Sequence, residues 1–474
     1  MQEETETIRL PERKDSRIFL IGIGGCSMSG LALLLKNRGY DVLGASSIDT
    51  EYIPALRENG IRVFMQDDPA LLAGVDLLVY SHAVSMENPL IAAAKREGIP
   101  ILSRSGLLGR FSESYDRTVC VCGTHGKTTV TSMLAQLLIE TGRDPTVHIG
   151  GIFPAMGGNV RAGKRDLFLT EACEYQRSFL RLRPSGIVLM NIEADHLDCY
   201  RDVDEIEETF GAFLQKLPED GWALGFGEDE RVLRQLRQLR CCTAAFGATG
   251  DCAYRMENAA EDPYGYHTFD FFHAGEKLGH VRMGIPGRFN AVNAAAALAA
   301  AHILGVDMPA ACEILGRFRG AHRRFERTGT LNGAEVFHDY GHNPAEMKNA
   351  VSIARKRCQR GRLWAVMQPN NYVRVKELFR DYLRCTAEAD ITLVTEIYGD
   401  RRKDPGGIRS EMLVEGMRAN GVCAVLTPEL SDAAALLRGS VQPGDLVITM
   451  GGGDVYLLNE LLKEPNERKA YESC

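Results

Sequence analysis

The stretch that decides the fold of this chain is residues 119–142, VCVCGTHGKTTVTSMLAQLLIETG. An apolar run at residues 118–122 is typical of a buried β-strand, and it leads into a turn with two glycines and then an amphipathic helix that ends at Gly142. This order predicts a phosphate-binding loop, because backbone N–H groups and a helix N-terminus attract phosphate oxygens. We expect the nucleotide to contact the following loop residues: Gly123, Thr124, His125, Gly126, Lys127, Thr128 and Thr129.

Within this loop Lys127 would supply a mobile positive charge, and the hydroxyl of Thr128 would bind Mg²⁺. The strict form of the motif places a glycine five residues before Gly126, where this chain has Val121. An ordinary strand-to-helix turn is therefore the alternative interpretation.

Composition limits the classes of protein that need to be considered. A chain of 474 residues fits about three domains, and 45% hydrophobic with 25% charged residues is typical of a globular protein. The net charge of −8 argues against a general nucleic-acid or membrane surface. The 13 scattered cysteines predict reduced thiols. No signal-peptide pattern at Met1 and no apolar run long enough to span a membrane is evident, so we expect a cytoplasmic protein.

The first third of the chain predicts a nucleotide-binding unit of Rossmann type. A strand at residues 17–21 is followed by Gly22, Gly24 and Gly25 and by a helix at residues 28–38. Further strands are expected at residues 40–44, 62–64, 76–81 and 99–102. The loop is suited to a diphosphate, but serines stand where a nicotinamide cofactor would need an acid after the second strand. An oxidoreductase is therefore the weaker reading.

The middle third places acidic and imidazole groups at predicted strand ends. Glu171 follows a strand at residues 166–170, and Asp195 and His196 follow a strand at residues 186–192. Strand tips beside a phosphate loop are where Mg²⁺ ligands belong, so Glu171 and His196 are candidate metal ligands; the alternative for His196 is a structural histidine.

Asn290 and Asn293 share one face of an Ala-rich helix that is expected to begin near Asn290. Their amides are suited to an adenine edge, although Asn290 is also a candidate helix cap.

The last third predicts a second α/β unit. A strand at residues 335–338 is followed by Asp339 on a loop, and Asn343, Pro344 and Glu346 mark the start of a helix. Strands at residues 363–367, 391–395 and 446–450 follow.

Taken together, GTHGKTT, NIEADHLD, GRFNAVNA and DYGHNP, in this order, resemble the Mur ligase family over essentially the whole chain. The resemblance implies an α/β protein of three domains. Residues 1–115 would form a Rossmann-like UDP-sugar-binding domain, residues 116–322 a central P-loop ATPase domain with a mostly parallel sheet, and residues 323–474 a Rossmann-like amino-acid-binding domain.

The resemblance also implies an activity. The closest pattern is that of the members that join L-alanine to the carboxylate of UDP-N-acetylmuramate through an acyl phosphate, in peptidoglycan precursor synthesis. ATP and Mg²⁺ would be required, no nucleic acid or membrane would be bound, and the protein would be a monomer or weak dimer. The implied catalytic residues are Lys127, Glu171, His196, Arg324 and Asp339. The implied substrate-binding residues are Gly22, Gly24, Gly25, Ser27, Met28, Ser29, His82, Arg104, Asn159, His342, Tyr372 and Arg374. Arg324 and Asp339 would also complete the nucleotide site.

Two segments depart from the family pattern. The family's Glu-Ala-Asp-Glu-Ser-Asp run is Glu-Ala-Cys-Glu-Tyr-Gln at residues 171–176, and its Gln-Pro-His-Arg-Tyr loop is Gln-Pro-Asn-Asn-Tyr at residues 368–372. An asparagine does not provide the charged fork that an arginine offers a carboxylate. A ligase with another amino acid or acid, or a non-catalytic nucleotide-sugar-binding regulator, is therefore the alternative.

Overall fold

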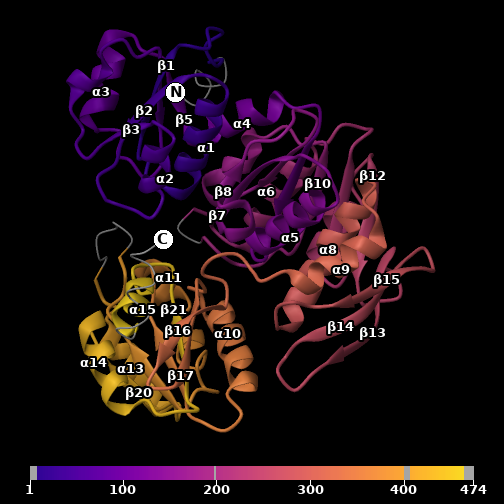
Figure 1. Ribbon diagram of the computed structural model, residues 1–474, viewed down its shortest axis with the longest axis vertical. Coiled ribbons are helices and arrows are strands. Elements are labelled where there is room, and N and C mark those ends of the chain that lie inside the picture. Colours follow the sequence, from indigo (N-terminus) through magenta and orange to yellow (C-terminus); the bar gives the residue numbers. More distant parts are fainter. Residues whose placement is uncertain (1–7, 197–198, 400–405, 464–474) are drawn as a thin grey trace.

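The computed structural model describes residues 8–196, 199–399 and 406–463. The strands of these residues form three sheets, of five, ten and six strands. Figure 1 shows them as three lobes, which we call the N-terminal, central and C-terminal units after their sheets. The fold is therefore mixed α/β, as the sequence predicted.

The N-terminal sheet has the strand order β3-β2-β1-β4-β5 and is parallel throughout the described residues. Its elements are β1 (Arg17–Ile21), α1 (Cys26–Asn37), β2 (Asp41–Ala45), α2 (Ile53–Glu58), β3 (Arg62–Phe64), β4 (Leu77–Tyr80), α3 (Pro89–Glu97), β5 (Ile101–Ser103) and α4 (Arg104–Glu113). The strand order reverses between β1 and β4, and parallel sheets bind ligands beside such a switch point. Helix α1 begins at Cys26 and not at Met28 as expected, because Gly25 is its N-cap residue.

The central sheet has the order β15-β14-β13-β12-β11-β10-β6-β9-β7-β8. Its strands are β6 (Thr118–Cys122), β7 (Thr146–Phe153), β8 (Gly158–Arg161), β9 (Phe168–Glu171), β10 (Gly186–Leu189), β11 (Trp222–Phe226), β12 (Cys242–Gly247), β13 (Tyr254–Glu261), β14 (His267–His273) and β15 (Glu276–Arg282). Its helices are α5 (Lys127–Glu140), η4 (Tyr175–Arg181), α6 (Val203–Leu214), α7 (Glu230–Leu236), α8 (Arg288–Ile303) and α9 (Met308–Arg317). The sequence analysis found β6, β9 and β10, but it missed the β7–β8 pair, β11, β12 and the antiparallel extension β13–β15.

The C-terminal sheet has the order β16-β17-β21-β18-β19-β20, and only the β16–β17 pair is antiparallel among its described strands. Its strands are β16 (Glu326–Leu331), β17 (Ala334–Asp339), β18 (Leu363–Met367), β19 (Ile391–Val394), β20 (Ala424–Leu426) and β21 (Leu446–Met450). Its helices are α10 (Pro344–Arg357), α11 (Tyr372–Glu377), α12 (Phe379–Tyr382), α13 (Ser410–Ala419), α14 (Leu430–Ser440) and α15 (Tyr456–Leu462).

Two local expectations about this part of the chain are corrected. Helix α8 begins at Arg288 with Gly287 as its N-cap residue, so Asn290 lies inside the helix and does not cap it. Asp339 is the last residue of β17 and does not lie on the loop beyond it.

The N-terminal and central units share one apolar core. Leu31 and Leu35 of α1 and Phe111 of α4 belong to the same buried cluster as Phe168 of β9 and Phe179 of η4. The apolar clusters found among the described residues of the C-terminal unit consist of that unit's own side chains. The first two units are therefore fixed to each other by hydrophobic burial, whereas the third shares no apolar cluster with them among the described residues.

No helix within the described ranges has the length and apolar character needed to cross a membrane.

We expect Asn343→Ala to lower the free energy of unfolding by about 1 kcal/mol, because Asn343 Oδ1 accepts the Glu346 N–H at 3.0 Å as the N-cap of α10. Urea unfolding followed by circular dichroism measures this change. Asn343→Ser, which keeps a capping oxygen, should lie close to the wild type; equal stability of the alanine variant would contradict the capping role.

Candidate functional site

A cavity of about 910 Å³ lies where the three units meet, and side chains from all of them line it. The predicted site residues that line it are Ser27, Arg104, Thr124, His125, Gly126, Lys127, Thr128, Thr129, Glu171, His196, Asn290, Asn293, Arg324, Asp339 and His342. The predicted residues that do not line it are Gly22, Gly24, Gly25, Met28, Ser29, His82, Gly123, Asn159, Tyr372 and Arg374. Tertiary folding therefore brings together most of the nucleotide and metal candidates, and fewer of the substrate candidates.

The loop between β6 and α5 needs glycine at Gly126. This residue has φ +86°, and a Cβ there would lie 2.7 Å from Asn293 Oδ1 of α8. Lys127 Nζ donates to the carbonyls of Gly123 and Thr124, and it lies 3.0 Å from Glu174 Oε2. Burial opposes the charge of Lys127, but the nearby Glu174 outweighs burial and raises the pKa of the ammonium group. Lys127 is therefore a cation at the first turn of α5.

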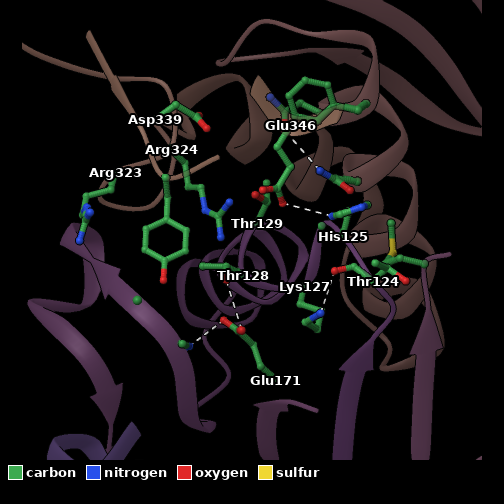
Figure 2. Close-up of a pocket in the computed structure, with 18 of the residues that line it drawn as sticks. Thr124, His125, Lys127, Thr128, Thr129, Glu171, Arg323, Arg324, Asp339 and Glu346 are labelled. Carbon is green, nitrogen blue, oxygen red and sulfur yellow. Dashed lines mark hydrogen bonds and ion pairs between the residues drawn. The ribbon is translucent and has the colours of Figure 1, made fainter. Parts of the chain in front are cut away.

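Thr128 and Glu171 present oxygen atoms to each other beside this turn, as Figure 2 shows. Thr128 Oγ1 donates to Glu171 Oε2 at 3.2 Å, and Glu171 Oε1 accepts the Gly150 N–H at 2.7 Å. Burial raises the pKa of Glu171, although Gly150 and Lys127 favour its charged form. A hydroxyl and a carboxylate at this spacing are oxygen donors of the kind that Mg²⁺ prefers.

His196 has a left-handed backbone, with φ +53°. Its Nε2 is 3.6 Å from Glu174 Oε1, and its ring packs on Tyr175 with 4.9 Å between ring centroids. Glu174, which is 3% exposed, therefore lies between Lys127 and His196. Asp198, the last residue of the NIEADHLD motif, lies outside the described residues.

The C-terminal unit contributes Arg324 and Asp339 to the cavity (Figure 2). Asp339 accepts the N–H groups of Phe325 at 2.8 Å and Gly341 at 2.7 Å, which fixes its carboxylate. Burial raises the pKa of Asp339, and Arg324 counteracts this effect. The Arg324 guanidinium lies 5.1 Å from the centre of the Tyr340 ring, a cation–π contact that supports an extended arginine.

His125 of the phosphate loop links the central unit to the C-terminal unit. Its Nδ1 is 3.1 Å from Glu346 Oε1 in the first turn of α10, and its Nε2 is 3.5 Å from Glu193 Oε2. Burial lowers the pKa of His125, but the hydrogen bonds to Glu193 and Glu346 outweigh burial and raise it to about 10. Glu346, although buried, has a pKa well below its ordinary value because His342 and His125 face it. The pair is therefore ionic at neutral pH.

The substrate candidates of the N-terminal unit gather at the start of α1. Arg104 Nη1 donates to Ser27 Oγ at 3.2 Å, while Asn159 Nδ2 of β8 donates to Ser29 Oγ at 3.2 Å and to the Cys26 carbonyl. Asn159 thus fixes the first turn of α1 through these hydrogen bonds, and it does not line the cavity. The pKa of His82 is lowered by burial and by the nearby Arg104.

The adenine candidates are hydrogen-bonded within the protein. Asn290 Nδ2 donates to the Pro286 carbonyl at 2.7 Å, and Asn293 Nδ2 donates to Asn290 Oδ1 at 3.3 Å. The two amides share one face of α8 as predicted. Asn293 also lies against Gly126, so α8 supports the phosphate loop.

Arg374 lies in α11, directly after the altered loop, and its Nη2 donates to Asp195 Oδ1 of the central unit at 3.2 Å. Arg374 Nε is buried and has no hydrogen-bond partner among the described residues. Asn371 has φ +67°, and its Oδ1 accepts the Val373 N–H at 3.0 Å as the N-cap of α11. Tyr372 is the first residue of that helix.

Sequence reasoning missed three side chains of this region as site residues. Glu346 was noted only for its place in the first helical turn, Glu174 only as part of an altered motif, and His148 of β7 was not considered at all. No local pattern identifies them, because each becomes relevant only through a contact with a distant segment.

Models of three protein families match the chain. "Mur ligase family, catalytic domain" matches residues 17–116, "Mur ligase middle domain" residues 121–301, and "Mur ligase, glutamate ligase domain" residues 323–453. The UDP-N-acetylmuramate--L-alanine ligase of Clostridium beijerinckii is 37% identical over 94% of this chain and 97% of its own length. The chain belongs to the Mur ligase family.

Two further comparisons agree with this assignment. The UDP-N-acetylmuramate--L-alanine ligase of Acetivibrio thermocellus is 37% identical over 97% of this Mur ligase and 98% of its own length. The crystal structure of UDP-N-acetylmuramate-alanine ligase from Thermotoga maritima superposes with a TM-score of 0.81, at 25% identity over 96% of this chain and 99% of that one. The three-unit fold of this Mur ligase is therefore shared with a solved structure.

We expect Glu346→Gln to lower the thermal midpoint at pH 7 by a few degrees, equivalent to about 1.5 kcal/mol, because it removes the charged partner of His125. The folded-state pKa of His125, about 10, is above its ordinary value of 6.5. The stabilisation is therefore fully present below pH 6.5, and it is lost as the pH rises through about 10. The gap between variant and wild type should shrink between melts at pH 7 and pH 10.5.

Glu335→Gln is the matched control, because Glu335 pairs with Arg357 and Arg327 inside the C-terminal unit and these arginines keep their charge at both pH values. A gap for Glu346→Gln that is the same at both pH values would exclude the ionic link.

Proposed function

We propose that this protein is an ATP-dependent ligase that joins an amino acid, L-alanine, to the carboxylate of UDP-N-acetylmuramate in peptidoglycan precursor synthesis. The observation that carries the proposal is the single cavity into which the phosphate loop, Glu171, Arg324 and Asp339 all open. Its curated relatives with nearly full-length similarity are named as ligases for these two substrates. A cytoplasmic location and a monomeric or weakly dimeric state are part of the same proposal.

The nucleotide end of the cavity fits ATP. The first turn of α5 offers backbone N–H groups and the Lys127 ammonium to the phosphates. Nζ is held by two loop carbonyls and Glu174, so it would leave them for the phosphate oxygens on binding. Asn290 and Asn293 lie on the α8 face that lines the cavity, and the adenine would rest near them.

The residues beside the phosphate loop also fit a magnesium ion. Thr128 Oγ1 and Glu171 would hold it together with phosphate oxygens, and His196 is the further ligand expected from the sequence. An ion bound there would neutralise the charge of the phosphate groups.

The acid substrate would bind at the start of α1. The backbone N–H groups of the helix N-terminus, that of Ser27 included, and the Arg104 guanidinium suit a diphosphate, since both offer N–H donors. The amino acid would enter from the C-terminal unit, where His342 lines the cavity; Arg374, the other candidate, pairs with Asp195 and does not line it.

The chemistry follows from these placements. In the first step the substrate carboxylate attacks the γ-phosphorus of ATP, ADP departs, and an acyl phosphate is formed. In the second step the amine of the amino acid attacks the acyl carbon and phosphate departs, which forms the amide. Negative charge develops on oxygen atoms in both steps, and Lys127 and Arg324 stabilise it at close range. Docking of the C-terminal unit excludes water that would otherwise hydrolyse the acyl phosphate.

The loop at residues 368–372 favours a second candidate, a Mur ligase that uses another amine. Asn371 stands where the family pattern has arginine, and its side-chain oxygen is engaged in capping α11. It therefore adds no positive charge to the amino-acid end of the cavity.

We expect Lys127→Ala to reduce ADP release at least about 100-fold, because a cation that stabilises the phosphoryl oxygens is lost. Coupled-enzyme detection of ADP with UDP-N-acetylmuramate, ATP, Mg²⁺ and L-alanine measures the rate. Lys95→Ala, at an exposed lysine of α3, is the control and should leave the rate unchanged. Turnover by Lys127→Ala at the wild-type rate would refute the assignment of the phosphate loop.

We expect L-alanine to give the fastest phosphate release in a screen of the proteinogenic amino acids and short peptides with UDP-N-acetylmuramate and ATP. Preference for a different amine would support the second candidate. No phosphate release with any amine, together with measurable binding of UDP-N-acetylmuramate, would replace both candidates by a non-catalytic binding protein.

A further inference from the structure

A chain of polar contacts crosses from the N-terminal unit to the central sheet, and the proposed reaction does not use it. Arg104 Nη1 donates to Ser27 Oγ at 3.2 Å, and Ser27 Oγ lies 3.1 Å from His148 Nε2. On the other side of the ring, His148 Nδ1 lies 3.3 Å from Thr170 Oγ1. Thr170 Oγ1 in turn donates to the Glu171 carbonyl at 3.1 Å.

The chemistry of the end groups fixes the direction of these hydrogen bonds. An arginine only donates, so Ser27 Oγ accepts from Arg104. The Thr170 proton lies on the Glu171 carbonyl, so Thr170 Oγ1 accepts from His148 Nδ1–H. In the neutral ring that is protonated on Nδ1, Nε2 is an acceptor and Ser27 Oγ donates to it, so the contacts with the two hydroxyl groups are satisfied, whereas the Ser27 carbonyl receives no hydrogen bond from the ring.

The surroundings of His148 favour this neutral form. The residue is 3% exposed, and burial together with the positive charge of Arg104 lowers its pKa to about 4. The Ser27 carbonyl also faces Nε2, at the longer distance of 3.4 Å.

His148 is rigidly held with respect to both halves of the site. It belongs to β7, and Gly150, two residues further along this strand, donates its N–H to Glu171 Oε1 at 2.7 Å. On the opposite side, a Cβ at Gly30 of α1 would lie 3.3 Å from His148 Cδ2, so the helix packs directly on the ring. The strand that orients Glu171 therefore also orients the first turn of α1.

The first turn of α1 is suited to an anion, and its geometry depends on His148. The N-cap residue is Gly25, which has no side chain to cap the helix, and the first turn contains no acidic residue. Ser27, Arg104 and His148 all line the cavity. A shift of Ser27 would move the Arg104 guanidinium with it, because Ser27 Oγ accepts one of its N–H groups.

We propose that His148 is a positioning residue for the acid substrate: it holds Ser27, and through Ser27 the Arg104 guanidinium, in the orientation that receives the substrate's diphosphate. This inference rests on the proposed function, since it presupposes a nucleotide-sugar acid at the start of α1. Because His148 is anchored on Thr170 beside Glu171, it also sets the distance between the acid-binding end and the phosphoryl-transfer end of the cavity.

Three substitutions of His148 test the contacts of its two ring nitrogens separately. His148→Gln can keep an acceptor oxygen near the position of Nε2, facing Ser27, and His148→Asn can keep a donor near the position of Nδ1, facing Thr170. His148→Phe removes both functions and keeps a ring. Ser27→Ala removes the partner, and His302→Phe, at a half-buried histidine bonded to Tyr254 at the other end of α8, is the matched control.

The test measures KM and kcat for UDP-N-acetylmuramate and for ATP with the full chain. We expect KM for UDP-N-acetylmuramate to rise about tenfold in His148→Phe, His148→Asn and Ser27→Ala, as the loss of one buried hydrogen bond implies, with KM for ATP within twofold of the wild type. His148→Gln should stay within about threefold of the wild type, and the double variant Ser27→Ala/His148→Phe should be no worse than either single variant, because the two residues act through one contact.

Equal increases of both KM values, or His148→Gln as impaired as His148→Phe, would overturn the proposal in favour of a packing role. Wild-type KM in His148→Phe would overturn it outright, and thermal melts of every variant show whether a loss reflects unfolding. Failure of the proposed function is recognised separately, as the absence of phosphate release by the wild type. In that case calorimetric titration of the two proteins with UDP is the deciding measurement. Weaker binding of UDP by His148→Phe than by the wild type would support the positioning role. Equal binding by both proteins, or no binding by the wild type, would contradict the positioning role.

Discussion

The hydrophobic contact between the N-terminal unit and the central sheet is the constraint on which the rest of the structure depends. Leu31, Leu35 and Phe111 are buried in the same cluster as Phe168 and Phe179, so α1 and α4 cannot move away without exposing a core. The start of α1 is thereby held beside β7 and β8. In the proposed function, this contact would limit the distance between an acid bound at α1 and a nucleotide bound at α5.

The C-terminal unit is held differently. Its contacts across the cavity include the ionic link between His125 and Glu346 and the pair of Arg374 with Asp195. His322, at the junction of the central and C-terminal units, adds a pair with Glu51 of the N-terminal unit, 3.4 Å from Nε2 to Oε2. Such contacts tolerate separation in water better than an apolar core does, since the separated charges are resolvated. A ligase that must admit ATP and later exclude water needs one interface of each kind.

The polar groups at the site owe their properties to burial. Glu171 and Asp339 have raised pKa values because their carboxylates are taken out of water, and each is fixed by backbone N–H groups. His125 lies in a comparable environment but faces two carboxylates, so its pKa rises. The same low-polarity surroundings would strengthen the proposed interaction of Lys127 and Arg324 with charge on phosphoryl oxygens.

The sequence by itself determined the parts that depend on local chemistry. Strands β1, β3, β6, β18 and β21 were predicted to the residue, because continuous apolar runs bounded by turn residues have few alternatives. The phosphate loop and the Asn343 cap were likewise evident, since glycine, lysine and capping residues act within a few positions of themselves. Only the tertiary structure decided that Asn159 donates to the first turn of α1, that Glu346 pairs with His125, and that His148 joins Ser27 to Thr170. These contacts link residues far apart in the chain, and no local pattern encodes which distant surfaces hydrophobic burial will bring within hydrogen-bonding distance.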